Sequence, residues 1–296
     1  RLVALVLLAA AGILAHAPEQ EVPDRRAQGP QLHISAVAFD RENRSIADLK
    51  ASDLEVWIGG YRVPIRTLTV VTSSDAPAAR SIVLLLDDRT IAPDLIPRSR
   101  EIARLFVNRM APGDQIAIVP LHGERTEFSG ERVLLLRTID GANLFQSAGV
   151  ERLEDIGAHV FEMIAALSRQ LVERQGGRKI IVGIGAARLF DTPIPPPTVA
   201  RSLRREWTEA MRATASAGAH VYVIDPAGLG AAPLLNGATG FARETGGHAF
   251  LNTNDFNGAV DRIMSEASNY YVISVDDPPV RRSADLRELD VRVKRT

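Results

Sequence analysis

Residues 81–90 read Ser-Ile-Val-Leu-Leu-Leu-Asp-Asp-Arg-Thr. The unbroken apolar run at residues 82–86 is typical of a parallel strand that is covered on both faces. The polar residues 87–90 then mark where that strand ends. Apolar residues recur at helical spacing from Ile102 to Met110, and Pro112-Gly113 stops this pattern. A strand followed by an amphipathic helix predicts an α/β fold.

The same alternation continues to residue 275. Further strands are expected at residues 116–121, 180–182, 221–224 and 270–275, an added edge strand at Val133–Leu136, and helices at residues 153–171, 199–214 and 256–267. Strands that alternate with helices predict a doubly wound, mostly parallel, Rossmann-like sheet. Residues 81–275 are therefore expected to form one α/β domain.

The chain on either side of this domain has a β pattern. Residues 30–72 contain three short apolar stretches, and Gly59-Gly60 between the second and third can form a tight hairpin turn. Residues 73–80 have the composition of a linker. Residues 276–296 add one alternating segment, at 289–293. We expect the two ends to form one small β module, because so few strands need further strands to pack against.

The N-terminus has the pattern of an export signal. Arg1 precedes an uncharged apolar run, and Ala15-His16-Ala17 supplies small residues at a cleavage site. We therefore expect a signal peptide at 1–17, a linker at 18–29, and a periplasmic or secreted protein. The run is too short for a membrane span, so no stable span is expected after cleavage. The alternative is a buried helix of a cytosolic fold.

The overall composition excludes several classes of function. The 296 residues carry a formal net charge of −1, which gives no long-range attraction to nucleic acid. There are no cysteines, so disulfides, thiol catalysis and cysteine metal sites are excluded. The sequence also contains no Walker loop, no dinucleotide-binding glycine motif and no Gly-x-Ser-x-Gly nucleophile motif. We therefore expect a non-catalytic protein without a cofactor.

Candidate binding residues lie where the predicted parallel strands end, because ligands of such sheets bind outside the carboxyl ends of the strands. The binding residues expected there are Asp87, Asp88, Arg89, Thr90, His122, Glu124 and Gly228. Their partner is expected to be another protein or a cell-surface macromolecule. Asp225 also follows a predicted strand, and we expect it to end that strand in a tight turn.

Several short motifs resemble those of an exported bacterial family that is related to the von Willebrand factor type A fold. They are residues 53–56, 84–87, 111–117, 178–182, 221–229, 245–250, 254–255 and 270–271. Each motif is weak alone, but together they cover most of the chain in the order that this family has. The resemblance implies a fold of the von Willebrand factor A type and a role in adhesion.

The resemblance also implies a metal-ion-dependent adhesion site, in which Asp-x-Ser-x-Ser ligands hold Mg²⁺. Asp87 matches the first position, but Arg89 and Ile91 replace the two serines, and neither side chain offers an oxygen ligand. Gly185-Ala186 occupies the place of a further aspartate. The site is therefore degenerate and no metal is expected. If a cation does bind, Asp87, Asp88 and Thr90 are its expected ligands.

Three functions remain open on this basis. The first is a protein-binding or adhesion module that does not depend on metal. The second is a divalent-cation-dependent adhesion module that uses Asp87, Asp88 and Thr90. The third is a hydrolase that uses His122 with Asp87 or Asp225. Metal-dependent thermal stabilisation would separate the first two functions.

Two groups of arginines have alternative interpretations. Arg89 is either a binding residue for a partner's carboxylate or a solvated loop residue paired with Asp88 or Asp94. Arg201, Arg204, Arg205 and Arg212 form a basic face of one expected helix, which we interpret as a solvated surface.

Overall fold

The structure is a computed structural model of the chain. The residues that it describes are 11–12, 31–40, 46–72, 79–141, 153–174, 177–185, 190, 197–230, 237–276 and 289–294. Apart from residues 11–12, the predicted signal peptide and the linker at 18–29 lie outside these ranges. The chain divides into two compact units, Arg1–Ser73 with Ser268–Thr296 (unit 1) and Ser74–Ala267 (unit 2).

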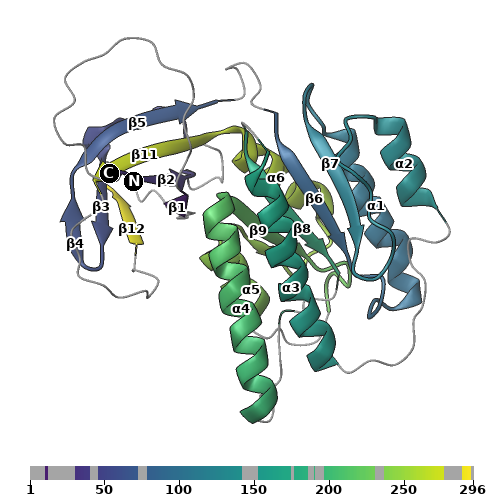
Figure 1. Ribbon diagram of the computed structural model, residues 1–296. Helices are drawn as coiled ribbons and strands as arrows, with labels where there is room; N and C mark the ends of the chain where they lie inside the picture. The colour runs from purple at the N-terminus through teal and green to yellow at the C-terminus, as the bar shows by residue number, and fades with distance from the viewer. Residues whose placement is uncertain are drawn as a thin grey trace. The chain divides into compact units, whose positions relative to one another are not determined.

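Unit 2 contains a five-stranded parallel sheet with helices on both faces (Figure 1). The strand order is β10-β9-β8-β6-β7. The strands are β6 (Ser81–Leu86), β7 (Gln115–Pro120), β8 (Lys179–Ile184), β9 (Ala219–Ile224) and β10 (Ala249–Phe250). The helices are α1 (Ile96–Asn108), α2 (Arg132–Asp140), α3 (Leu153–Val172), α4 (Pro197–Ala217), α5 (Gly237–Glu244) and α6 (Phe256–Ser268), and the short 3-10 turn η2 (Pro93–Leu95) precedes α1. The expected α/β class is confirmed.

Each face of this sheet has its own hydrophobic core. Residues of α3, α4 and α5 pack on one face, and residues of α1, α2 and α6 pack on the other. All six residues of β6 and all six of β9 are buried, as a strand between two helical layers requires. This arrangement leaves the two ends of the strands as the places where polar side chains gather.

Two expectations about individual strands are wrong. Residues 133–136 lie in helix α2, not in an edge strand, because Leu135 and Ile139 are buried one helical turn apart while Val133 and Leu134 are exposed. Strand β11 (Tyr270–Asp276) does not belong to the parallel sheet. It pairs antiparallel with β2 and β5 of unit 1.

Unit 1 consists of two antiparallel sheets around one core. The first has the order β1-β2-β11-β5, with β1 (Ala11–Gly12), β2 (Gln31–Ala36) and β5 (Ile65–Val71). The second has the order β12-β3-β4, with β12 (Leu289–Val293), β3 (Leu54–Ile58) and β4 (Tyr61–Val63), and the 3-10 turn η1 (Ala51–Asp53) leads into β3. Gly59 and Gly60 have φ values of 57° and 81° at the turn between β3 and β4, a conformation that favours glycine.

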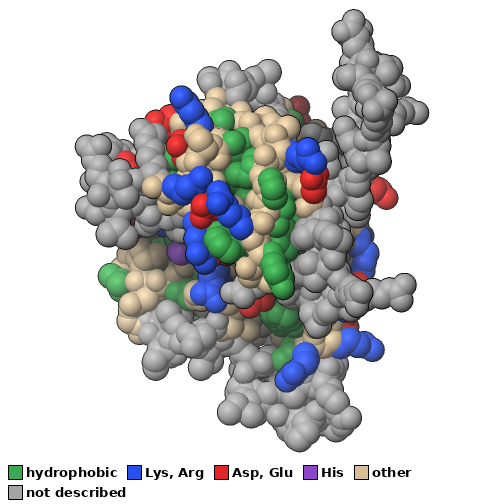
Figure 2. All heavy atoms as spheres, turned by 90° about the vertical axis from the view of Figure 1, so that its left-hand side faces the viewer, with side chains coloured by type: hydrophobic (Ala, Val, Ile, Leu, Met, Phe, Trp, Pro, Cys, Tyr) green, Lys and Arg blue, Asp and Glu red, His purple; other side chains and the backbone are tan. Residues whose placement is uncertain are grey.

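The surface of unit 1 carries paired charges. Arg62 lies 3.2 Å from Glu55, Arg292 lies 2.7 Å from Asp290, and the Arg292 guanidinium stacks over the Trp57 ring. Figure 2 shows such a mixture of basic, acidic and hydrophobic side chains on one face of the molecule. Arg62 and Arg292 are therefore each paired with a carboxylate on the same strand or its neighbour.

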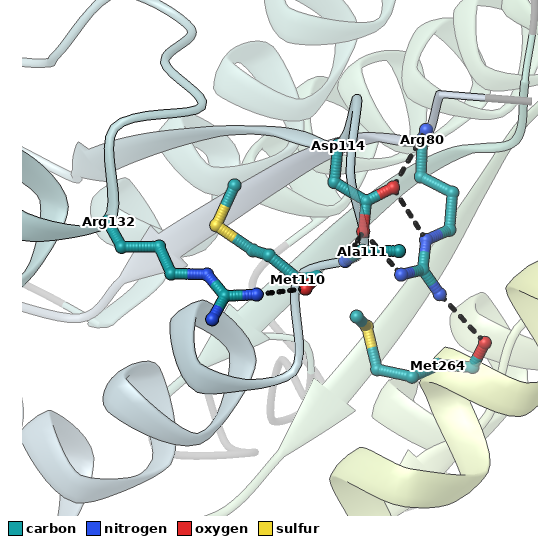
Figure 3. Close-up of polar contacts among 6 residues, drawn as sticks. All are labelled: Arg80, Met110, Ala111, Asp114, Arg132 and Met264. Carbon is teal, nitrogen blue, oxygen red and sulfur yellow. Dashed lines mark hydrogen bonds and ion pairs between the residues drawn. The ribbon is translucent and has the colours of Figure 1, made fainter. Parts of the chain in front are cut away.

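A buried ion pair joins the segments at the amino ends of the parallel strands (Figure 3). Asp114 accepts hydrogen bonds from the Arg80 backbone N–H (3.1 Å), from Arg80 Nε (2.9 Å) and from the Ala111 N–H (2.7 Å), and it also pairs with Arg80 Nη2. Arg80 Nη1 donates to the Met264 carbonyl oxygen at 3.1 Å. Residues just before β6 and β7 and residues of α6 are therefore held together.

The same end of the sheet contains buried titratable groups. The His220 side chain is buried at the start of β9, with Nδ1 3.1 Å from the Gly246 carbonyl oxygen. Burial, and then the charge of Arg178, lower the pKa of His220 well below its ordinary value. The Tyr222 hydroxyl donates to Glu266 at 2.9 Å, and Arg262 pairs with the same carboxylate. His220 is therefore neutral in the folded protein near neutral pH.

We expect the stability of the protein to fall as the pH drops below about 6.5, the ordinary pKa of histidine. Below this pH, His220 binds a proton in the unfolded chain but stays neutral in the folded protein. The free energy of unfolding should fall by up to about 1.4 kcal/mol per pH unit for this proton. Urea denaturation from pH 7.5 to 5 measures the slope, and His220→Asn should reduce it. An equal slope in the variant would assign the effect elsewhere, for example to His248, whose pKa burial also lowers.

Candidate binding site at the carboxyl edge of the parallel sheet

The sheet register brings most of the predicted binding residues to one edge. Leu86 is level with Pro120 in β7 and with Ile184 in β8, and Ile184 is level with Ile224 in β9. The residues that follow these strands are therefore neighbours. The backbone bonds continue past the strand ends, since Asp87 N–H donates to the Ile184 carbonyl oxygen at 3.0 Å.

The Asp87 carboxylate is bound by its own loop. Oδ1 accepts the backbone N–H groups of Arg89 (3.1 Å) and Thr90 (2.7 Å). Oδ2 accepts the Thr90 hydroxyl at 2.5 Å. Asp87 is only 2% exposed, so these bonds replace the water that it would otherwise bind. They fix the turn after β6 and occupy most of the acceptor positions that a cation would need.

Gly185 allows Asp87 to sit in this position. A Cβ atom on Gly185 would overlap the Cβ of Asp87. Beside them is a cavity of about 10 Å³, with lining residues that also include Leu85, Leu121, Val160 and Phe190. Such a space admits one water molecule at most. Among the residues that the structure describes, this cavity is therefore too small for a hydrated ion.

Asp88 and His122 form the second polar pair at this edge. The His122 backbone N–H lies 3.2 Å and 3.3 Å from the two Asp88 carboxylate oxygens, and His122 Nδ1 lies 3.8 Å from Oδ1. Burial raises the pKa of Asp88, although the N–H donors and His122 partly offset this. The His122 ring packs at 5.0 Å from the ring of His159. The structure thus pairs His122 with Asp88, whereas the hydrolase hypothesis names Asp87 or Asp225.

Glu124 and Arg125 border a shallow hollow beside the same edge. This hollow has a volume of about 480 Å³, and Val119, Pro120, Gly123 and Met163 complete its lining. Glu124 is exposed, and its carboxylate is accessible from solvent. It can contact a partner without first losing a bond within the protein.

The loop after β9 presents an apolar side chain. Asp225 Oδ1 accepts the Ala227 N–H at 2.9 Å, so this carboxylate, like Asp87, stabilises its own turn. The N–H groups of Leu229 and Gly230 donate to Asn254 Oδ1 (3.2 Å) and Asn252 Oδ1 (3.1 Å). Leu229 is 63% exposed. The loop is therefore held in one conformation with a large hydrophobic group in solvent.

Sequence reasoning identified Gly228 as a binding residue, named Leu229 and Asn254 only as parts of family motifs, and did not name Asn252. Asparagines often bond to loop N–H groups, and this is the signal that could have drawn attention to them. In the part of the chain that the structure describes, no three His, Cys, Asp or Glu side chains are grouped as metal ligands. None of the described helices combines the length and the apolar character needed to cross a bilayer.

Comparison with known proteins gives structural matches only. No family model matches the chain, and no curated protein does. Among solved structures, the D319A mutant of the PilB minor pilin from Streptococcus sanguinis has 10% identity and a TM-score of 0.44, over 81% of this chain and 76% of that one. The three N-terminal domains of the type V pili tip protein Mfa5 from Porphyromonas gingivalis match with 12% identity and a TM-score of 0.29, over 62% and 26%. Human Sec24c matches with 9% identity and a TM-score of 0.37, over 81% and 42%.

These findings correct the family assignment. The structural neighbours are a minor pilin and a pilus tip protein, not von Willebrand factor type A domains, and no family model supports that family. The assignment made from the sequence motifs is therefore wrong. At these low identities and TM-scores, no function is transferred from the neighbours to this chain.

Proposed function

We propose that the chain is an exported, non-catalytic module that binds another protein or a cell-surface macromolecule, and that it does so without a bound cation. The binding surface is the carboxyl edge of the parallel sheet. Support for export comes from the basic, apolar and small-residue pattern of the N-terminus. One observation carries the proposal: the Asp87 carboxylate accepts three hydrogen bonds from donors in its own loop.

The edge has the properties of a preformed contact surface. Asp87, Asp225, Asn252 and Asn254 hold its loops through side-chain bonds to the backbone. Loops that are already ordered lose little conformational entropy when a partner binds. The groups that they present are the exposed Leu229, Glu124 and His122 and the partly exposed Arg89. An exposed apolar side chain together with charged groups of both signs suits a protein partner.

The same contacts support a non-catalytic role. Asp87 and Asp225 stabilise turns, so neither carboxylate is placed to orient His122 as a general base. Asp88, which does lie near His122, is almost fully buried behind it.

The melting temperature of the protein should be the same in EDTA as in millimolar Mg²⁺, Ca²⁺ or Mn²⁺. A site with a micromolar dissociation constant would add roughly 4 kcal/mol to the free energy of unfolding at those concentrations, which a thermal melt detects easily. Asp87→Asn is the control, because the amide keeps an acceptor oxygen but is a poor cation ligand. An increase of several degrees with a cation, lost in Asp87→Asn, would instead establish a cation-dependent module.

A further inference from the structure

We propose that the groove between α3 and α4 binds an extended acidic segment of a protein partner. Helices α3 and α4 run side by side on one face of the parallel sheet (Figure 1). The groove has a volume of about 580 Å³. Its lining residues are Arg169, Arg204, Arg205, Glu206, Thr208, Glu209 and Arg212. This site shares no residue with the carboxyl edge of the sheet.

Two of the four arginines are already paired within the groove. Arg169 Nη2 donates to Glu209 at 2.7 Å, across the two helices. Arg205 donates to Glu206 through Nε (2.8 Å) and Nη2 (2.6 Å). These pairs hold the two carboxylates in place. They leave a lining that carries two more positive than negative charges.

The other two arginines, Arg204 and Arg212, are exposed on α4. Among the described residues, no carboxylate lies within ion-pair distance of either guanidinium. Thr208 lies between them on the same face of the helix, and its hydroxyl donates to the Arg204 carbonyl oxygen at 2.7 Å. The positions 204, 208 and 212 therefore form a straight stripe at intervals of about one helical turn.

The spacing of Arg204 and Arg212 favours a chain over a small anion. Eight residues of α-helix rise about 12 Å. One sulfate or phosphate ion is much smaller than this axial separation of the two helix positions. An extended peptide advances about 3.3 Å per residue, so carboxylates four residues apart match the distance and lie on the same side of the peptide. Each arginine can then bind one carboxylate in a bidentate pair.

The two glutamates favour a peptide over an anionic polysaccharide. Glu206 and Glu209 would repel a polymer that carries negative charge along its whole length. A peptide has N–H donors between its acidic side chains, and a carboxylate can accept further hydrogen bonds besides those from arginine. The alternation of signs in the groove therefore matches a polypeptide with spaced acidic residues.

The test uses a fluorescein-labelled synthetic peptide, otherwise uncharged, with two glutamates four residues apart. Fluorescence anisotropy measures its binding to the full chain at 0.01 M ionic strength, where the Debye length is about 30 Å. We expect Arg204→Gln/Arg212→Gln to weaken binding by roughly three- to thirtyfold, the effect of removing two exposed ion pairs. The control Arg137→Gln/Arg243→Gln, which removes the same charge from α2 and α5, should leave binding unchanged. Circular dichroism verifies that both variants fold.

A second peptide, with its glutamates three residues apart, places the carboxylates on opposite sides of an extended chain and should bind more weakly. Equal binding of the two peptides, no binding of either, or an equal loss in the control variant would overturn the proposal. Tighter binding of heparin than of the peptide, lost in Arg204→Gln/Arg212→Gln, would assign the groove to a polysaccharide and also overturn it. None of these outcomes bears on cation binding, so the proposed function at the sheet edge is tested separately.

Discussion

Asp114→Ala should lower the free energy of unfolding by about 3–5 kcal/mol, the cost of leaving a buried charge without its partner. The Arg80 side chain is only 7% exposed, and Asp114 is the carboxylate that neutralises it (Figure 3). The substitution also leaves the Ala111 N–H and the Arg80 N–H without their acceptor. Urea denaturation followed by circular dichroism measures the change.

The control for this prediction is the double variant Arg80→Met/Asp114→Leu, which removes both charges and keeps apolar volume. Its stability should lie between that of Asp114→Ala and that of the unmodified protein, because it leaves no buried charge unpaired but, like Asp114→Ala, removes the acceptor of the Arg80 and Ala111 N–H groups. Arg132→Met is a second control in the same region, because it removes an exposed arginine whose hydrogen bond within the described residues goes to the Met110 carbonyl oxygen. An Asp114→Ala variant as stable as Arg132→Met would show that the buried pair contributes nothing.

Gly185→Ala should lower the free energy of unfolding by about 1–3 kcal/mol, the usual cost of an overpacked core position. The new methyl group would overlap the Cβ of Asp87, so the Asp87 loop has to move. The bonds from Arg89 N–H and Thr90 N–H to the carboxylate should weaken with it. Amide hydrogen exchange at Thr90 reports this directly and should become faster.

Gly240→Ala is the matched control for that substitution. Gly240 lies in helix α5, and a Cβ atom there meets nothing within 4 Å. Alanine stabilises a helix interior by roughly 0.5–1 kcal/mol relative to glycine, so this variant should be unchanged or slightly more stable. If Gly185→Ala behaved in the same way, the close packing of Asp87 against Gly185 would not be important for stability.

The sequence predicted most of the parallel sheet because its strands leave a pattern that few other structures share. The continuous apolar runs in β6, β8 and β9 predict strands that are covered on both faces, and the structure buries them in this way. The run at Val133–Leu136 misled the prediction, since four apolar residues fit a helix as well as a strand. Tyr270–Asp276 was recognised as a strand, but its pattern does not say which sheet it joins.

The sequence predicted where the candidate site lies, but it did not predict the hydrogen bonds that its side chains make. Polar residues directly after buried strands have to gather at one edge of the sheet, which is why Asp87, His122 and Asp225 were found. Whether Asp87 binds a cation or its own loop depends on three hydrogen bonds that no sequence pattern specifies. The family resemblance failed for a related reason. Motifs such as Leu84–Asp87 follow from any buried parallel strand that ends in a polar turn.

The connectivity of unit 1 sets the order in which this protein can fold. Tyr270 of β11 pairs with Val71 of β5, so the four-stranded sheet stays incomplete until residues 270–276 have been synthesised. In unit 2, the bond from Arg80 to the Met264 carbonyl oxygen joins the first and last segments. Once unit 2 has folded, the long chain between β5 and β11 behaves as a short connection, and the entropy cost of closing the sheet falls. The arginine that neutralises Asp114 thereby also raises the local concentration of one half of unit 1 near the other.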